Sequence, residues 1–164
     1  MAFPFANQGV RADFGAPSRP SADPEAGREA IESRRVVVSD AVFGSVSRQW
    51  VYNVLQPLFP EDREPMVLGL SRTAEGLSPA LLANKLPDGW NVALVDDNGA
   101  ILAASPGAGN PGGHLGIADM TPITNSGGWI ELDTPDEPYL AVVQRSALTG
   151  WKLFAWAPRA LIAQ

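Results

Sequence analysis

A pattern of short apolar strands occurs twice along this chain of 164 residues, and it limits the fold more than any other feature of the sequence. Residues 36–70 read as a strand, a turn, a long strand, a polar connection and a third strand, and residues 129–157 repeat that order. Within the long strand the residues alternate, so Trp50 and Tyr52 lie on one face and Asn53 on the other. The repeat predicts two copies of one antiparallel module; chance similarity among short strands is the alternative.

The second copy is preceded by a hairpin over residues 90–104, where Asn98 and Gly99 separate two apolar runs. In the first copy only residues 1–14 stand in the corresponding place, so we expect the first module to be truncated at its N-terminus. A cap-plus-proline pattern predicts a helix between the modules, and Pro158 predicts another at the end. The sequence thus predicts an α+β fold of two antiparallel-sheet modules. Its predicted parts are residues 1–73, a connecting helix over 74–89, and residues 90–164.

A further short helix is predicted at the start of the first module. Asp23 has the character of an N-cap and Pro24 that of a first helical residue, which places the helix over residues 25–33. Because the composition of these residues is typical of a surface segment, we expect the helix to flank the module.

The composition excludes several kinds of protein. The chain has no cysteine, which rules out disulfides, thiolate catalysis, zinc ribbons and iron–sulfur clusters. Its net charge of −6 argues against binding to a nucleic-acid backbone. No apolar run approaches the ~20 residues of a membrane-spanning helix. His114 is the only histidine and has no partner spaced for metal binding or a catalytic triad, so we expect no enzyme, no metal and no cofactor.

Residues 105–127 are rich in glycine and proline and show no helical or strand period. Within them, residues 107–112 match the G-x-G-x-x-G pattern of a dinucleotide-binding loop. That function requires a helix directly after the loop, whereas Gly113, Gly116 and Pro122 follow here. We therefore predict a mobile loop over the second sheet in place of a nucleotide site.

The first module carries the side chains that best suit a small-molecule site. Pockets for small ligands combine aromatic and apolar walls with a few polar anchors. That inventory is supplied by Asp40, Phe43, Arg48, Trp50, Tyr52 and Asn53. The alternative is structural: the aromatic side chains pack in the core, Arg48 lies at a solvated edge, and Asp40 caps a turn.

Three stretches of the sequence occur in a set order. They are VSDAVFG at residues 38–44, LPDGW at 86–90 followed by ALVDDNGAILA at 93–103, and RSALTGW at 145–151. In this order and spacing the chain resembles the Cache domains of bacterial receptors, over residues 36–164. The resemblance implies two tandem PAS-like modules, as in the periplasmic double-Cache sensor regions of histidine kinases.

The same resemblance implies a function. The chain would be the periplasmic part of a membrane-anchored receptor, binding a small molecule of unknown identity in its first module and signalling to an output such as a histidine kinase. A homodimer is compatible with such a receptor. The alternative is a ligand-free PAS-like spacer or dimerisation module. Cache modules that bind amino acids resemble one another in an Arg-x-Trp-Tyr signature and a later Asp; Val51 and Ser71 stand in those places here, so an amino-acid ligand is not expected.

Overall fold

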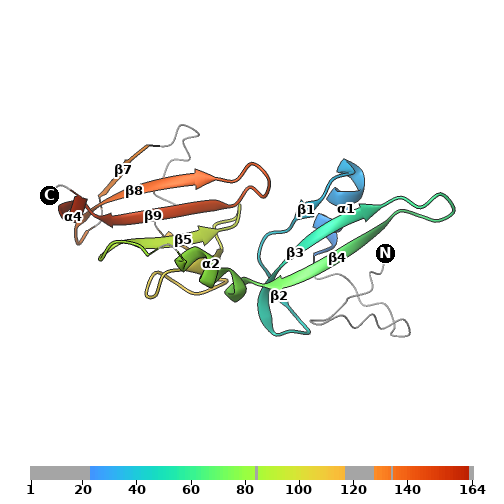
Figure 1. The fold of residues 1–164 in the computed structure, drawn as a ribbon, viewed down its shortest axis with the longest axis horizontal. Coiled ribbons are helices and arrows are strands. Elements are labelled where there is room, and N and C mark those ends of the chain that lie inside the picture. Colours follow the sequence, from blue (N-terminus) through green and yellow to red (C-terminus); the bar gives the residue numbers. More distant parts are fainter. Residues whose placement is uncertain (1–22, 84, 117–127, 134, 163–164) are drawn as a thin grey trace. The chain divides into compact units, whose positions relative to one another are not determined.

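The computed structural model of the chain divides into two compact units, Met1–Thr73 and Ala74–Gln164, and each contains its own antiparallel sheet (Figure 1). The described residues are 23–83, 85–116, 128–133 and 135–162. Every strand pairing among them is antiparallel, and the strands are accompanied by short helices. The predicted α+β class is therefore confirmed.

The first unit has one helix and four strands among its described residues. In chain order they are α1 (Pro24–Ser33), β1 (Val37–Val38), β2 (Val42–Gly44), β3 (Gln49–Leu58) and β4 (Met66–Thr73). β3 is central: β1 and β2 pair with its two halves along one edge, and β4 pairs along the other. The predicted three-strand meander is present, with its first strand split in two.

Local signals set the ends of α1. The Asp23 side chain accepts a hydrogen bond from the main-chain N–H of Ala26 (3.0 Å), and Pro24 occupies the first turn. Arg34 ends the helix in the left-handed conformation, with φ of 57°. Ala26 and Ala30 are buried in a cluster with Leu55 of β3 and Val67 of β4. The predicted helix is thus correct, but its small residues form part of the core, because they let the helix lie close to the sheet.

The alternation of β3 and β4 gives the first sheet two faces. We call the inner face the one that α1 contacts through Leu55; Val51 and Asn53 lie on it and are buried. The outer face carries the alternate positions, which are half-buried or exposed: Trp50, Tyr52, Val54, Met66, Leu68 and Leu70. The sequence prediction that Trp50 and Tyr52 share one face and Asn53 lies on the other is confirmed.

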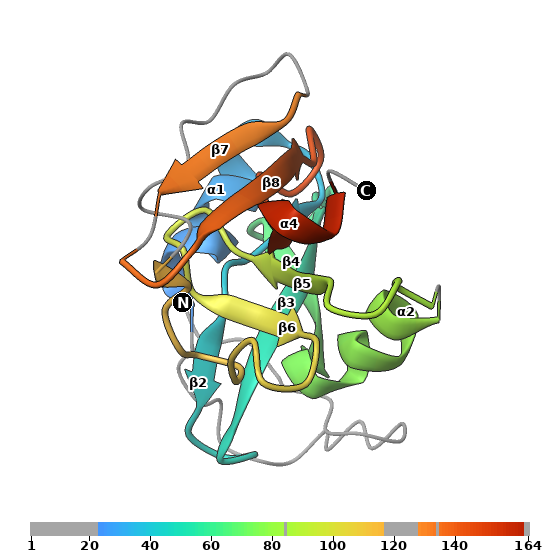
Figure 2. The ribbon, with the colours of Figure 1, turned by 90° about the vertical axis from the view of Figure 1, so that its left-hand side faces the viewer.

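The second unit has five strands and three short helical segments among its described residues. In chain order they are η1 (Ala74–Leu77), α2 (Ser78–Leu82), β5 (Asn91–Val95), β6 (Ile101–Ala104), β7 (Ile130–Asp133), β8 (Pro138–Arg145), β9 (Lys152–Pro158) and α4 (Arg159–Ile162). The sheet order is β6-β5-β9-β8-β7, and four of these strands are labelled in Figure 2. The first strand of the unit, β5, therefore lies beside its last strand, β9, which is the central strand of the sheet.

The helices of this unit are shorter than predicted. η1 and α2 occupy residues 74–82 of the segment 74–89, and both contact β6. Pro87 disfavours helical geometry in the residue before it, which limits extension toward the next strand. α4 begins at Arg159, because Pro158 is still the last residue of β9.

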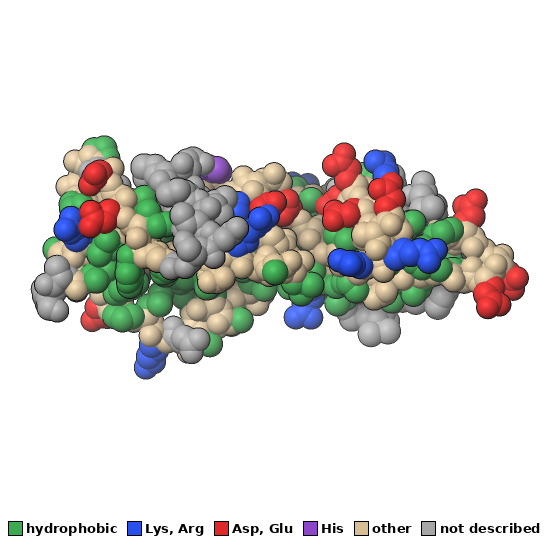
Figure 3. All heavy atoms as spheres, turned by 90° about the horizontal axis from the view of Figure 1, so that it is seen from above, with side chains coloured by type: hydrophobic (Ala, Val, Ile, Leu, Met, Phe, Trp, Pro, Cys, Tyr) green, Lys and Arg blue, Asp and Glu red, His purple; other side chains and the backbone are tan. Residues whose placement is uncertain are grey.

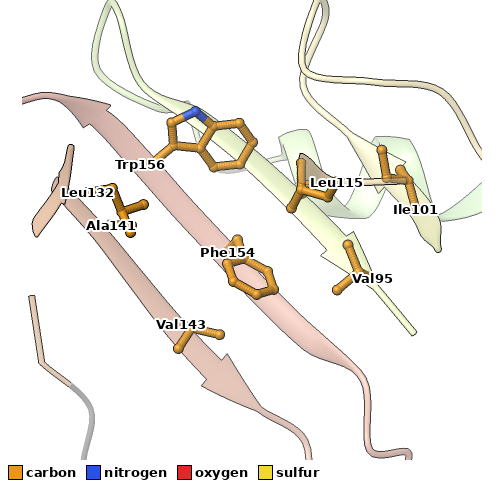
Figure 4. Packing of buried hydrophobic residues seen from close by; sticks show 9 residues of the cluster. Val95, Ile101, Leu115, Leu132, Ala141, Val143, Phe154 and Trp156 are labelled. Carbon is orange, nitrogen blue, oxygen red and sulfur yellow. The ribbon is translucent and has the colours of Figure 1, made fainter. Parts of the chain in front are cut away.

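The core of the second unit lies on one face of its sheet (Figure 4). Phe154 and Trp156 of β9 lie between Val143 and Ala141 of β8 on one side and Val95 on the other. Each of these side chains is apolar and at most 8% exposed. Period-two alternation thus places a continuous apolar layer on one side of the sheet.

The loop predicted to be mobile is partly built into this core. Ile101 of β6 donates its N–H to the carbonyl of Gly113 (2.8 Å) and accepts from the N–H of Gly112 (2.8 Å). Leu115 is buried against the apolar cluster. Residues 105–116 thus differ from a loop that merely lies over the sheet, because backbone pairing to β6 and one buried leucine tie the segment to it. The remainder, residues 117–127, lies outside the described residues.

Candidate functional site

The six predicted site residues lie on both faces of the first sheet. Phe43 is opposite Trp50 on the outer face, and Tyr52 follows Trp50 on the same face. Asn53 is on the inner face. Arg48 and Asp40 are outside the strands, in the turn before β3 and between β1 and β2. A small ligand contacts one face of a sheet, so the six side chains do not form a single cluster.

The aromatic members form a pair that faces outward. The rings of Phe43 and Trp50 have centroids 5.7 Å apart and meet edge to face at 73°. Phe43 is exposed and Trp50 is half-buried. Tyr52 lies opposite Arg72 of β4 on the same face. This group is a surface feature of the first unit; the inner face has a different chemistry.

Polar side chains on the inner face form a hydrogen-bonded network. The Ser39 hydroxyl donates to the carbonyl of Asp40 (2.9 Å) and accepts from the main-chain N–H of Asn53 (2.9 Å). The side-chain nitrogen of Asn53 lies 3.4 Å from the same hydroxyl, and Ser71 donates to Asn53 Oδ1. Asn53 is 4% exposed and Ser39 is also buried, while Ser71 is half-buried. We call Ser39, Asn53 and Ser71 the polar network.

The polar network retains hydrogen-bonding capacity at one end. A hydroxyl offers one donor and two acceptor sites, and the contacts of Ser39 use all three. A primary amide offers two of each, and the Asn53 side chain uses one donor and one acceptor within the described part of the chain. The remaining capacity is therefore at the Asn53 amide and the Ser71 hydroxyl. A small polar group placed there would meet neutral donors and acceptors.

Sequence reasoning included Asn53 in the site but missed Ser39 and Ser71. Both were visible as sequence features, Ser39 in the VSD stretch and Ser71 as the residue in place of a carboxylate. Their contact with Asn53 depends on the pairing of β3 with β4, where Asn53 lies opposite Ser71. Ser39 likewise reaches Asn53 because the chain between β1 and β2 stays beside β3, with Ser39 N–H bonded to the Asn53 carbonyl (2.9 Å).

Two of the sequence stretches that carry the resemblance meet in the second unit. Asp96 Oδ1 accepts from the main-chain N–H groups of Asn98 (3.0 Å) and Ala100 (2.8 Å), which closes the turn between β5 and β6. The next residue, Asp97, forms an ion pair with Arg145 at the start of the RSALTGW stretch. These contacts stabilise the turn between β5 and β6 and link it to the end of β8. Among the residues that the structure describes, no group of three His, Cys, Asp or Glu side chains is placed to hold a metal ion.

Charge on the face drawn in Figure 3 does not single out another site. On the face drawn in Figure 3, acidic and basic side chains are interspersed among apolar ones, and neither sign dominates. The phenol of Tyr139 has a shifted pKa: Glu137 accepts a hydrogen bond from the Tyr139 hydroxyl (2.9 Å) and raises the pKa of that group. Within the described ranges, no helix is long and apolar enough to cross a bilayer.

Comparison with known proteins identifies the fold. No family model matches the chain, and no curated protein does. Solved structures match over most of it: the ligand-binding domain of Mlp24 with asparagine has a TM-score of 0.65 at 13% identity, over 92% of this chain and 63% of that one. The fold is that of a Cache-like sensor domain.

Two further Cache-like domains agree. The extracellular domain of the candidate histidine kinase rpHK1S-Z16 has a TM-score of 0.68 at 13% identity, over 92% of this chain and 65% of that one. The sensory domain of the Campylobacter jejuni chemoreceptor Tlp3 has a TM-score of 0.63 at 20% identity, over 85% and 55%. The chain thus spans less than two thirds of the length of each of these Cache-like domains.

Proposed function

We propose that this chain is the extracytoplasmic sensor region of a bacterial receptor, that it lies in the periplasm, and that it acts by binding a small molecule, not by catalysis. In this proposal the units are two tandem PAS-like modules, and the parent protein is anchored in the membrane. Its output is a histidine kinase or another cytoplasmic signalling module.

The observation that supports this function is the shared fold, together with a polar network on the inner face of the first sheet. The similar domains include Mlp24 with asparagine and Tlp3 in complex with L-valine, so this fold accommodates small ligands in those proteins. In this chain the polar network sits among apolar residues such as Val51, which is the mixture that small-ligand sites use.

We place the ligand on the inner face, against Asn53 and Ser71, with Asp40 at the adjoining strand break. Phe43, Trp50 and Tyr52 then do not contact the same ligand, since they lie on the opposite face. Binding alters signalling only to the extent that the ligand prefers one arrangement of the module over another. A ligand that contacts the segment between β1 and β2 would favour one conformation of that segment over another.

A ligand-free spacer or dimerisation module is the second candidate. It is favoured by the hydrogen bonds of the Ser39 hydroxyl, which are all made within the protein and leave that group no capacity to bind a ligand. It is also favoured by the exposed apolar side chains of β4, which suit contact with another protein surface.

A thermal-shift screen separates the two candidates. The panel holds L-asparagine, L-valine, carboxylates, purines and polyamines, each tested on the whole chain. A ligand at 100 times its Kd stabilises the folded state by about 2.7 kcal/mol, which raises Tm by roughly 5–10 °C in a chain of this size. A compound that raises Tm in wild type supports the sensor function, and a panel without effect supports the spacer.

A matched pair of variants locates the site. Asn53→Leu removes the buried amide on the inner face, and Gln56→Leu removes an exposed amide from the same strand. We expect the ligand-induced rise in Tm to disappear in Asn53→Leu and to persist in Gln56→Leu. Equal rises in both variants would place the ligand elsewhere.

A further inference from the structure

The two long strands of the first unit present only uncharged side chains on the inner face of their sheet. The inner positions of β3 and β4 are Val51, Asn53, Leu55, Pro57, Val67, Gly69, Ser71 and Thr73. The one charged residue of these two strands, Arg72, lies opposite Tyr52 on the outer face. Burying a charged group is costly unless an opposite charge or several hydrogen bonds accompany it. This surface therefore favours an uncharged ligand.

The polar network places a hydrogen-bond donor beside an acceptor on this face. The side-chain nitrogen of Asn53 carries two hydrogens, and within the described ranges it donates one of them, to the Ser39 hydroxyl. The Ser71 hydroxyl donates its single hydrogen to Asn53 Oδ1, so the Ser71 oxygen keeps its acceptor sites. Because Asn53 is 4% exposed, leaving its second N–H without a partner costs free energy. A ligand group that accepts from Asn53 and donates to Ser71 would use both.

Gly69 leaves room beside this donor and acceptor. It takes the inner position of β4 next to Ser71, about 6.5 Å along the strand, and lies opposite Leu55. Among the described residues, only Cδ2 of Leu55 comes within 4 Å of the point that a Cβ of Gly69 would occupy, at a distance of 3.2 Å. The apolar part of a ligand therefore fits over Gly69 and Leu55 while its polar edge meets Asn53 and Ser71.

We propose that the ligand of this site is an uncharged molecule with an amide edge, that is, a carbonyl oxygen beside an N–H group. The carbonyl oxygen accepts from the second N–H of Asn53, and the ligand N–H donates to the Ser71 oxygen. Carboxamides, lactams, pyrimidines and purines carry such an edge, whereas a free carboxylate brings a charge that the inner positions of β3 and β4 do not balance. This inference rests on the proposed sensor function, since it specifies what the same site binds.

Three compounds of nearly the same shape test the class of ligand. Benzamide is neutral and has the amide edge, benzoate is an anion with acceptors only, and benzamidinium is a cation with donors only. We expect benzamide to raise the Tm of the whole chain and to bind with a Kd about tenfold or more below those of the other two. Uracil, which has the same edge in a ring, should also raise Tm. Equal or tighter binding of benzoate or benzamidinium overturns the inference and leaves the sensor function standing.

Absence of any effect from these four compounds also overturns the inference. The wider ligand screen then shows whether the sensor function fails with it, because a different compound that raises Tm would keep that function.

Substitutions in the polar network place benzamide at this site. Asn53→Asp keeps the side-chain shape but replaces the donors with a charged acceptor, and Gln56→Glu makes the same change at an exposed position of the same strand. We expect the benzamide Kd to rise about tenfold or more in Asn53→Asp and to stay unchanged in Gln56→Glu. Ser71→Ala, which removes only the acceptor, should also weaken binding and serves if Asn53→Asp does not fold, with Ser47→Ala as its control. Unchanged affinity in Asn53→Asp and Ser71→Ala overturns the inference.

Discussion

Arg145 Nη2 lies 3.0 Å from Asp97 Oδ1, although 48 residues separate the two in the sequence. Lys152 Nζ lies 3.5 Å from the same carboxylate oxygen and 3.1 Å from the main-chain carbonyl of Asp97. Lys152 pairs with Val95 on one side and with Arg145 on the other. One carboxylate at the turn after β5 thus ties that turn to the hairpin of β8 and β9.

Asp97→Ala should weaken the second unit modestly. The side chains of Arg145 and Asp97 are 46% and 50% exposed, so solvent screens much of their attraction, and Lys152 keeps its bond to the main-chain carbonyl. We expect a loss of about 1 kcal/mol in the free energy of unfolding, smaller at high salt. Urea denaturation at two salt concentrations measures it. The control is Asp88→Ala, also at an exposed position; an equal loss there would show that the ion pair adds nothing.

Two glycines in the segment after β6 differ in how closely the core approaches them. Gly107 and Gly109 both have positive φ, 85° and 146°, so alanine is strained at either position. A Cβ at Gly107 would meet nothing within 4 Å, whereas one at Gly109 would collide with Cδ1 of the buried Ile101. We therefore expect Gly109→Ala to cost about 1–3 kcal/mol more than Gly107→Ala, because a packed core resists added volume and because φ of 146° lies farther from the left-handed region that alanine can enter. Thermal denaturation of both variants measures the difference, and similar losses would contradict both the greater strain and the close packing at Gly109.

Sequence patterns predicted the features that depend on neighbouring residues. Asn98 and Gly99 between two apolar runs predicted the hairpin of β5 and β6, and Asp23 with Pro24 predicted the start of α1. These signals act within a few residues, so the sequence alone determines them. The alternation along β3 also predicted that Trp50, Tyr52 and Asn53 divide between two faces.

Features that depend on distant residues could not be predicted in this way. Which face of β3 forms the site depends on where α1 packs, and the contact of Asn53 with Ser71 depends on strand register. Leu115 shows the same limit. Its glycine-rich surroundings indicate a loop, but its burial depends on pairing with β6, which no local pattern encodes.

Ser39→Ala should destabilise the first unit. The variant removes the acceptor for the main-chain N–H of Asn53 and leaves that buried group without its partner. An unsatisfied buried polar group costs about 1–3 kcal/mol. Ser47→Ala is the control, since Ser47 is exposed and its hydroxyl makes only a 3.5 Å contact with the Gly44 carbonyl. Chemical denaturation of both proteins tests this, and faster exchange of the Asn53 amide hydrogen should accompany the loss.

The pKa of Tyr139 should lie above its ordinary value of 10.0, and Glu137 should be the main cause. The hydroxyl of Tyr139 donates to Glu137 Oε1 at 2.9 Å, and ionising the phenol would replace that bond with two facing negative charges. Because the folded-state pKa is raised, the stability from this contact is fully present below pH 10 and is lost as the pH rises through the raised pKa. Spectroscopic titration in a Tyr52→Phe background observes Tyr139 alone. Glu137→Gln should lower the pKa toward 10.0, and Asp136→Asn, which removes a weaker influence, should lower it less; the reverse order would exclude the hydrogen bond as the cause.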